Sequence, residues 1–221
     1  MYTVKEIFPT LQGEGAHTGR AAVFCRFSGC NLWSGREDDR SEAICKFCDT
    51  DFVGTTGEGG GKFENAIALA DAIENSWLTM NASLSRRYVV FTGGEPLLQL
   101  DESVIQELHS RGFTIAIETN GTIRVPEGVD WVCVSPKIGS ELVAKQADEI
   151  KFVIPQFDAL GNPVDILSHL KRFEKMNFTN FFLQPMDDIH KQENTKLAIQ
   201  LCQQRPLWRL SIQTHKLLGI A

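Results

Sequence analysis

Short runs of β-branched and aromatic residues alternate with helical periods along most of this chain, and that alternation constrains the fold more than any other feature. Strands that alternate with helices form βα units, in which neighbouring strands pair in parallel. The runs that we predict as strands are 23–28, 88–92, 113–118, 131–134, 150–154, 181–183 and 208–212.

Four apolar stripes at helical spacing lie between these runs. We predict one helix over 64–77, with Ile67, Ala70, Ile73 and Trp77 on its buried face, and a second after an N-cap at Asp101. A third is predicted to begin at Asn162-Pro163, because proline suits the first helical position. A fourth covers 193–203.

The length of the chain sets how far a barrel can close. A complete eight-fold β/α barrel needs about 250 residues, and this chain has 221. We therefore predict an α/β fold, a partial parallel barrel of about six to seven strands, in a single domain over 1–221. The glycine-rich segment 54–62 is predicted to be a mobile loop.

A cluster of polar or turn-forming residues follows six of the predicted strands. In parallel α/β barrels the active site lies at these carboxyl ends of the strands, so we expect the clusters to share one site. They are 29–31, 92–96, 118–121, 135–137, 184–187 and 213–216.

Charge and the amino terminus exclude several classes of protein. The net charge is −6, and no basic run of five or more residues appears, which argues against nucleic acid or a membrane surface as a partner. The first twenty residues lack an apolar secretory segment, so we expect a cytoplasmic protein.

The six cysteines fall into two groups. Cys25, Cys133 and Cys202 lie in apolar patterns, and we expect them to be buried core residues. Cys30, Cys45 and Cys48 lie among glycine and polar residues, where no core needs a thiol. Structural zinc normally has four ligands, whereas three thiolates leave one iron of a four-iron cluster open. The spacing favours a cluster, with zinc and a redox CxxC as open alternatives.

With these thiols, the motifs of the chain resemble the 7-carboxy-7-deazaguanine synthase (QueE) family of the radical S-adenosylmethionine (SAM) superfamily. The usual CxxxCxxC spacing of the superfamily is replaced here by an insertion at about 31–44, as in some members of the family. The matching segments are 6–8, 10–15, 48–50, 93–96, 118–121, 135–137, 184–187 and 213–216.

The resemblance implies a fold, a reaction and cofactors. The fold is the partial barrel of the radical SAM type, and the reaction converts 6-carboxy-5,6,7,8-tetrahydropterin to 7-carboxy-7-deazaguanine with loss of ammonia. It serves the biosynthesis of queuosine and other 7-deazapurines. A [4Fe–4S] cluster reduces SAM to a 5′-deoxyadenosyl radical, SAM is regenerated, and Mg²⁺ assists. The protein orients and shields these groups.

The resemblance also implies roles for particular residues. Cys30, Cys45 and Cys48 would hold the cluster, and Thr50 would bind Mg²⁺, although its residue pattern alone favours a turn cap. The residues implied in SAM binding are Lys46, Phe47, Asp49, Gly94, Ser135, Pro136, Lys137, Gln184, Pro185, Met186 and Asp187. Those implied in substrate binding are Leu11, Gln12, Gly13, Arg26, Thr92 and the terminal Ala221.

Three side chains are candidates for binding the substrate or for transferring protons to and from it. An inward-facing Arg26 needs an anion, either the substrate carboxylate or an internal glutamate. Glu118 and His215 could bind the amidine-like edge of a pterin or move protons, or they could be structural partners of Arg26 or Lys137.

Two other functions remain open at this stage. One is a different radical SAM enzyme that acts on a protein, such as a glycyl-radical activase, and the other is a non-enzymatic zinc or iron–sulfur module. The partners implied by the resemblance are a second copy of the chain and a flavodoxin-type electron donor.

Overall fold

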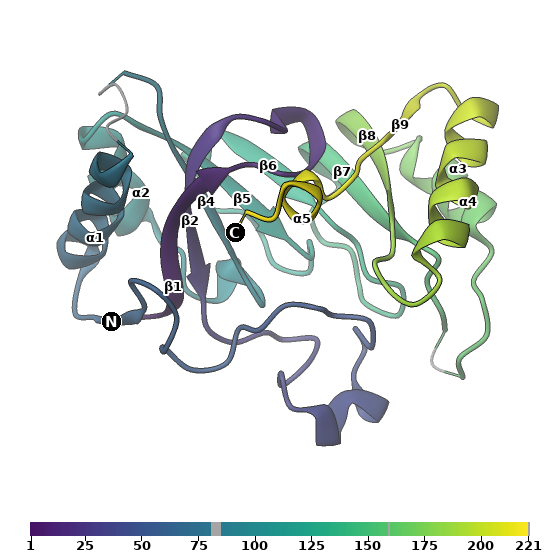
Figure 1. Cartoon of the computed structure of the whole chain (residues 1–221), viewed down its shortest axis with the longest axis horizontal. Coiled ribbons are helices and arrows are strands. Elements are labelled where there is room, and N and C mark those ends of the chain that lie inside the picture. Colours follow the sequence, from purple (N-terminus) through teal and green to yellow (C-terminus); the bar gives the residue numbers. More distant parts are fainter. Residues whose placement is uncertain (81–84, 159, 221) are drawn as a thin grey trace.

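The computed structural model describes residues 1–80, 85–158 and 160–220, which form one nine-stranded sheet in the order β3-β1-β2-β4-β5-β6-β7-β8-β9. Seven neighbouring strands of this sheet are parallel, which confirms the predicted partial β/α barrel (Figure 1). They are β2 (Ala21–Phe27), β4 (Arg87–Gly93), β5 (Phe113–Thr119), β6 (Trp131–Val134), β7 (Gln146–Ile154), β8 (Asn177–Pro185) and β9 (Trp208–Leu210).

Two antiparallel strands that the sequence did not predict extend one edge. β1 (Tyr2–Leu11) pairs with β2, and β3 (Gly61–Phe63) pairs with β1. β1 contains Pro9, and proline cannot donate to a strand ladder, so the sequence of β1 does not indicate a strand. Pro9 is tolerated because β3 pairs only with residues 2–4 of β1, which leaves the other side of β1 free of strand pairing at Pro9.

The glycine-rich segment 54–62 lies against β1, contrary to the prediction of a mobile loop. Gly57 N–H donates to the Lys5 carbonyl at 3.0 Å, and Ile7 N–H donates to the Glu58 carbonyl at 2.7 Å. A Cβ atom at Gly60 would lie 2.2 Å from the Lys5 carbonyl oxygen. The glycines therefore permit a close backbone approach.

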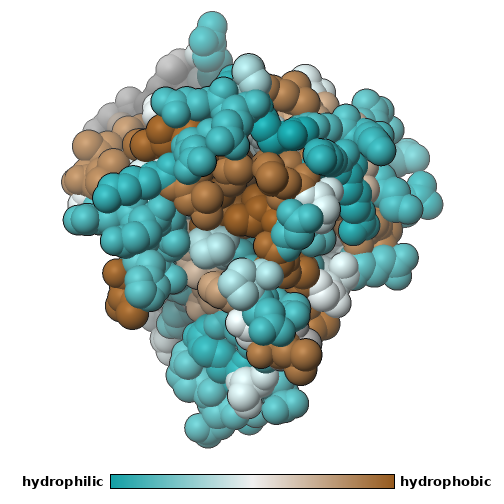
Figure 2. All heavy atoms as spheres, turned by 90° about the vertical axis from the view of Figure 1, so that its right-hand side faces the viewer, coloured by the Kyte–Doolittle hydropathy of each residue, from teal (hydrophilic) through white to brown (hydrophobic). Residues whose placement is uncertain are grey.

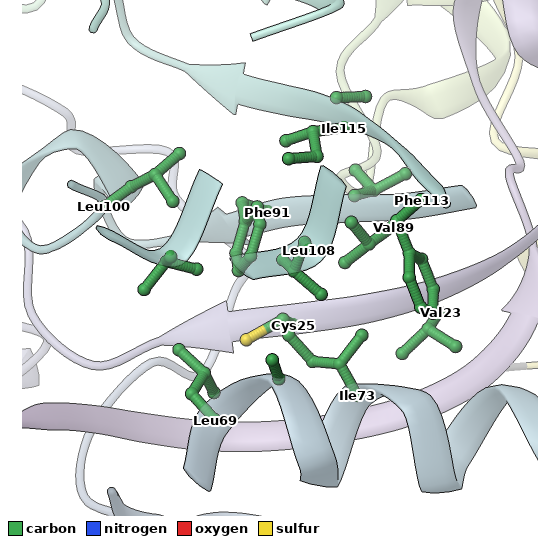
Figure 3. Close-up of a cluster of buried hydrophobic side chains, with 14 of the residues drawn as sticks. Val23, Cys25, Leu69, Ile73, Val89, Phe91, Leu100, Leu108, Phe113 and Ile115 are labelled. Carbon is green, nitrogen blue, oxygen red and sulfur yellow. The ribbon is translucent and has the colours of Figure 1, made fainter. Parts of the chain in front are cut away.

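Helices cover the outer face of the sheet in two pairs (Figure 1). The first pair packs on β1, β2, β4 and β5, and the second pair packs on β6 to β9. The pairs are α1 (Ala66–Thr79) with α2 (Glu102–Ser110) and α3 (Ile166–Phe173) with α4 (Lys191–Gln204). Figure 3 shows the first core, where Cys25 of β2 lies between strand and helix side chains, as predicted.

Helix boundaries and faces differ from prediction in two places. Asp101 caps α2 as predicted, but α3 begins at Ile166 with Asp165 as its cap, because Pro163 instead pairs with Phe157 in an isolated bridge. Ile67 is 57% exposed. At 100° per residue it lies about 100° from the centre of the buried stripe of α1.

Alternation along the strands gives the sheet two different faces. On β7, Ile150 and Phe152 point into the outer core, whereas Glu149 and Lys151 point inward. Cys133 of β6 is buried on this inner face beside Glu149 rather than in the apolar core, and Cys202 is only partly buried. The inner face therefore carries the charges that the outer core excludes.

The segment after β1 crosses from that edge of the sheet to the end of β9 and the short helix α5 (Thr214–Leu218) (Figure 1). Thr214 N–H donates to the Gly13 carbonyl at 3.0 Å, and Gly15 N–H donates to Ser211 Oγ at 3.0 Å. The chain thus bridges the open side of the barrel without strand pairing. None of the helices in the described residues is long and apolar enough to span a membrane.

Candidate active site

A cavity of about 460 Å³ opens at the carboxyl ends of the parallel strands, where the sequence predicted one shared site. It gathers residues from all six of the predicted polar clusters. The predicted site residues that line it are Leu11, Gln12, Gly13, Arg26, Cys30, Cys45, Phe47, Cys48, Asp49, Thr50, Thr92, Gly94, Glu118, Ser135, Lys137, Gln184, Pro185, Met186, Asp187 and His215.

Three predicted site residues are not among the lining residues. Lys46 is exposed, and Pro136 is buried behind the cavity, with its carbonyl accepting from Gln156 Nε2 at 3.1 Å. Ala221, the predicted terminal substrate contact, lies outside the described residues.

The three predicted cluster thiols face the cavity together. A hydrogen bond between Cys45 and Cys48 lowers the pKa of Cys48 to about 6 and raises that of Cys45, while burial raises the pKa of Cys30. In the part of the chain described here, no three His, Cys, Asp or Glu side chains lie close enough to hold a single metal ion. Zinc needs thiolates at about 2.3 Å, whereas cluster thiolates bind different irons. The donor set therefore fits a cluster.

The insertion between the first two thiols has its own small core. We call residues 30–51 the cluster loop; it contains a 3₁₀ helix over Glu37–Glu42. Trp33 and Ala43 pack with Phe52. Arg40 stacks on the Trp33 ring at 4.0 Å and donates to the Lys46 and Cys48 carbonyls at 2.9 and 3.0 Å. One arginine therefore ties the insertion to the CxxC.

The turn after β4 lies directly against the first thiol. A Cβ atom at Gly94 would be 2.6 Å from Cys30 Cβ, so only glycine fits this approach. Glu95 is fully buried and accepts hydrogen bonds from Leu97 N–H at 3.0 Å, Thr119 Oγ1 at 2.7 Å and Asn120 N–H at 2.8 Å. Burial raises the pKa of Glu95. This side chain joins the ends of β4 and β5.

Charged side chains connect the predicted SAM segments. Lys137 Nζ donates to the carbonyl and hydroxyl oxygens of Ser135 at 2.7 Å and lies 5.8 Å from the centre of the Phe47 ring. Lys216 Nζ forms ion pairs with Asp49 at 2.8 Å and Asp187 at 2.7 Å. It therefore bridges the cluster loop and the segment after β8.

Arg26 takes the second of its two predicted partners. Its Nε donates to Glu6 Oε1 at 2.7 Å, across the register that pairs Glu6 with Arg26 in β1 and β2. The guanidinium still lines the cavity, and because it has five donors, one ion pair leaves others for an anion.

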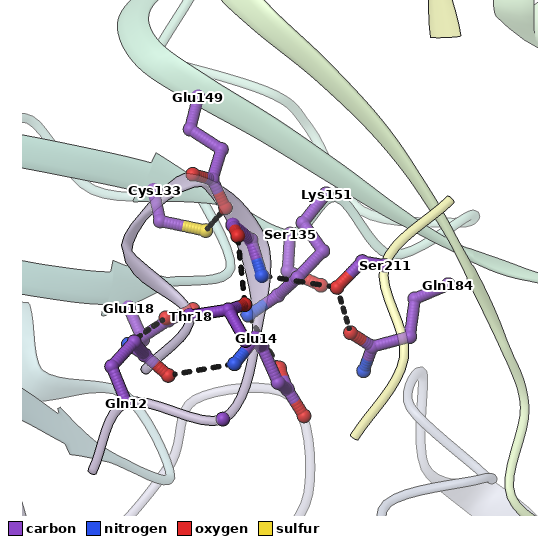
Figure 4. A network of polar contacts seen from close by, with 12 residues as sticks. Gln12, Glu14, Thr18, Glu118, Cys133, Ser135, Glu149, Lys151, Gln184 and Ser211 are labelled. Carbon is purple, nitrogen blue, oxygen red and sulfur yellow. Dashed lines mark hydrogen bonds and ion pairs between the residues drawn. The ribbon is translucent and has the colours of Figure 1, made fainter. Parts of the chain in front are cut away.

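Glu118 is paired with neither of its predicted structural partners. Its Oε2 lies 2.7 Å from Lys151 Nζ, and its Oε1 accepts from Gln12 Nε2 at 3.2 Å. Lys151 is 5% exposed, lines the cavity and also pairs with Glu14 at 2.6 Å (Figure 4). We call Glu14, Glu118 and Lys151 the charged floor.

Sequence reasoning missed Glu14 and Lys151 as members of the site. Glu14 was part of a matching motif without an assigned role, and Lys151 lay in a predicted strand. The available signal was the charged pair Glu149 and Lys151 at alternate positions within an apolar strand, which indicates an inward face.

The electrostatics of the charged floor follow from burial and mutual attraction. Burial alone would raise the pKa of Glu14, but Lys151, with a hydrogen bond from Gln213 and the nearby His215, lowers it. Burial alone would lower the pKa of Lys151, but Cys133, Glu118, Glu14 and Glu149 raise it well above its usual range. Burial also lowers the pKa of His215, which favours a neutral imidazole in the cavity.

A partial β/α barrel with three thiols and a glycine-rich turn at the carboxyl ends of its strands defines the radical SAM class of enzyme. The crystal structure of QueE from Escherichia coli has this fold: it covers 96% of this chain and 93% of its own, with a TM-score of 0.68 and 28% identity.

Sequence comparison then identifies the family. A 7-carboxy-7-deazaguanine synthase from Bradyrhizobium diazoefficiens is 60% identical over 219 residues, and one from Bordetella pertussis is 57% identical over 219 residues. Each alignment covers 99% of both proteins. No protein-family model matches the chain. The chain belongs to the 7-carboxy-7-deazaguanine synthase family, and this membership implies a [4Fe–4S] cluster and SAM as cofactors.

Proposed function

We propose that this chain, as one domain over 1–221, converts 6-carboxy-5,6,7,8-tetrahydropterin to 7-carboxy-7-deazaguanine with loss of ammonia, in 7-deazapurine biosynthesis. One observation carries the proposal beyond family membership. The three thiols line the same cavity as Arg26 and the charged floor. A radical source and a polar, carboxylated ring would therefore be held in one cavity.

The cofactor side of the cavity would hold the cluster on Cys30, Cys45 and Cys48. When bound, the cluster and SAM would supply the radical chemistry, as a source of the 5′-deoxyadenosyl radical. SAM would lie along Phe47, Asp49, Gly94 and the segments 135–137 and 184–187. The exposed Lys46 would contribute its backbone or the aliphatic part of its side chain.

On the substrate side, the chain would bind and orient the pterin. Arg26 would bind the substrate carboxylate with the donors that Glu6 leaves free. Glu118 would accept hydrogen bonds from the amidine-like edge, and the neutral His215 would take up or release a proton as ammonia leaves. Leu11, Gln12, Gly13 and Thr92 would contact the ring, and the terminal Ala221 would contribute main-chain atoms.

Mg²⁺ would bind at Thr50, which lines the cavity two residues after Cys48. Magnesium keeps several waters and takes substrate oxygens, so one hydroxyl together with the substrate carboxylate suffices. Its function would be to neutralise that carboxylate beside Arg26.

The partners that we propose are a second copy of the chain and a flavodoxin-type electron donor, in the cytoplasm, without nucleic acid or membrane. On the side that carries α3 and α4, apolar side chains lie in an area bordered by polar ones (Figure 2). Exposed apolar residues of these two helices include Leu167 and Ile199. An apolar area of this kind supports self-association.

The test is an anaerobic reaction of reconstituted protein with SAM, Mg²⁺, reductant and 6-carboxytetrahydropterin, followed by mass spectrometry. We expect the mass of 7-carboxy-7-deazaguanine from the wild type and from the control Cys202→Ala, and none from Cys48→Ala. Cleavage of SAM to 5′-deoxyadenosine without this product would overturn the substrate assignment and favour a radical SAM enzyme with another substrate.

A further inference from the structure

Lys151 occupies an unusual place for a lysine, since its ammonium group is buried in the inner face of the sheet yet lies at the cavity wall. Its Nζ is 2.6 Å from Glu14 Oε2 and 2.7 Å from Glu118 Oε2. The two carboxylates come from segments far apart in the chain, the loop after β1 and the end of β5. Figure 4 shows Lys151 between them.

Gln12 ties the same two glutamates together on their other side. Its Nε2 donates to Glu118 Oε1 at 3.2 Å, and its Oε1 accepts from the Glu14 backbone N–H at 3.1 Å. Both glutamates and Gln12 line the cavity. Glu14 and Glu118 are therefore fixed in position while oxygen lone pairs remain available on the cavity side.

Stability alone does not account for this arrangement. A buried ion pair contributes little net stability compared with well-packed apolar residues of the same size, and the outer face of the same strands uses apolar residues. Two carboxylates without the ammonium would repel, and one of them would take up a proton near neutral pH. A protonated carboxyl donates through one oxygen and no longer offers a matched pair of acceptors.

We propose that Lys151 is a positioning residue, which holds the Glu14 and Glu118 carboxylates as paired acceptors for the N–H donors of the pterin ring. The ring presents its N3–H and 2-amino group side by side, and a carboxylate accepts such a pair through both oxygens. Lys151 itself does not contact the reacting atoms. This inference rests on the proposed function, because it takes the pterin as the ligand of the charged floor.

The charged and titratable groups that face Lys151 determine how pterin binding would depend on pH once Lys151 is replaced. The titratable groups are Glu14 from the loop after β1, Glu118 from β5, the Cys133 thiol from β6 and Glu149 on β7 itself, while Tyr88 of β4 faces Glu118 and His215 of α5 faces Glu14. Lys151 is the cation among them. Removing it would take away the attraction that lowers the pKa of Glu14, so pterin binding should acquire a new ionisation.

The test measures binding of pterin-6-carboxylate, a fluorescent and unreactive analogue, to the cluster-loaded protein. Lys151→Met should weaken binding about tenfold or more and make it improve as the pH rises from about 6 to 7.5. In the wild type, pterin affinity should not change over this pH range, and Lys151→Arg should restore that behaviour. The control Lys145→Met, at an exposed residue next to β7, should bind as the wild type does. SAM affinity should not change.

The 2-oxo analogue, lumazine-6-carboxylate, tests the donor pair directly. The wild type should prefer the pterin by about tenfold or more, because a site built for a donor rejects a ligand that lacks it. Lys151→Met should lose most of that preference. If Lys151→Met does not fold, Lys151→Met/Glu118→Gln, which removes one charge of each sign, should still bind SAM but bind the pterin weakly.

Two results would separate this inference from the proposed function. If Lys151→Met, or the double variant in its place, binds the pterin with the affinity and pH profile of the wild type, the role of Lys151 is wrong and the proposed function stands. If the wild-type protein binds no pterin and forms no deazaguanine, the proposed function itself is wrong.

Discussion

Two parts of the cavity lining are built in different ways, and we call the charged floor the substrate end and the cluster loop the cofactor end. Glu118 and Lys151 of the charged floor lie on the paired strands β5 and β7, whereas Glu14 lies in the segment after β1 and is held by its ion pair to Lys151. The cluster loop has only a 3₁₀ helix, a small apolar cluster and the contacts of Arg40. Two of the three floor residues thus belong to the sheet, whereas the whole cluster loop lies outside it.

This difference indicates whether the fold or a bound cofactor holds the side chains of each end in place. The geometry of the floor follows from the fold and is in place before any ligand binds. The loop buries few apolar side chains, so its opening free energy should be low until metal binding adds to it. The substrate end is preorganised by the protein, and the cofactor end is completed by its cofactor.

Removing the iron should produce the largest contrast between the two ends. Without the cluster, trypsin should cleave after Arg36, Arg40 and Lys46 about a hundredfold faster, because a ligand at a hundred times its dissociation constant suppresses opening by that factor. Limited proteolysis with mass spectrometry measures these rates. Cleavage after Lys175, an exposed site beyond α3, serves as the control. Equal rates at the loop sites in both states would mean that the loop is as preorganised as the floor.

Gly13→Ala should disturb the substrate end alone. An added Cβ would lie 2.1 Å from His215 Nδ1, so the imidazole must move, and the Gly13 carbonyl that accepts from Thr214 N–H would move with it. We expect a loss of about 10- to 100-fold in kcat/KM with the pterin, with SAM affinity unchanged.

The matched control for that substitution is Gly61→Ala, where the nearest atoms to a new Cβ lie at 3.9 Å on Phe63. It should have wild-type kinetics. A parallel loss of SAM affinity in Gly13→Ala would contradict the separation of the two ends.

The same contrast explains what the sequence could and could not predict. The seven parallel strands, the shared cavity and the three thiols facing it follow from local patterns and motifs. β1 was missed because Pro9 and the charges of Lys5 and Glu6 obscure its alternation. The pairing of Lys151 with Glu14 and Glu118 was missed because it joins three distant segments, and only the closed fold brings these together.

Lys216 lies where the two ends meet, since α5 places His215 toward Gly13 and Lys216 toward the cofactor segments. Lys216→Met should weaken SAM binding by about two- to fivefold, because a partly exposed ion pair contributes about 1 kcal/mol or less; the Lys216 side chain is 32% exposed. Lys191→Met, which removes only the ion pair with Asp187, should weaken SAM binding less.

The pH and salt dependence of this contact can be worked out from its pKa shifts. Hydrogen bonds from Lys191 and Lys216 lower the pKa of Asp187, so its contribution is present above its usual value of 3.8 and is lost as the pH falls through the lowered one. Burial would lower the pKa of Lys216, but Asp187 and Asp49 raise it, so its contribution is lost only as the pH rises beyond its usual 10.5.

Between about pH 5 and 9 the contribution of the Lys216 ion pairs to SAM affinity should therefore be constant. Ionic strength is the sharper probe, because salt screens exposed charges. Calorimetric titration of SAM into the cluster-loaded protein at rising ionic strength should show affinity falling in the wild type and nearly flat in Lys216→Met. An equal salt slope in both proteins would show that Lys216 does not couple the cluster loop to the segment after β8, leaving the cofactor end ordered by its cofactors alone.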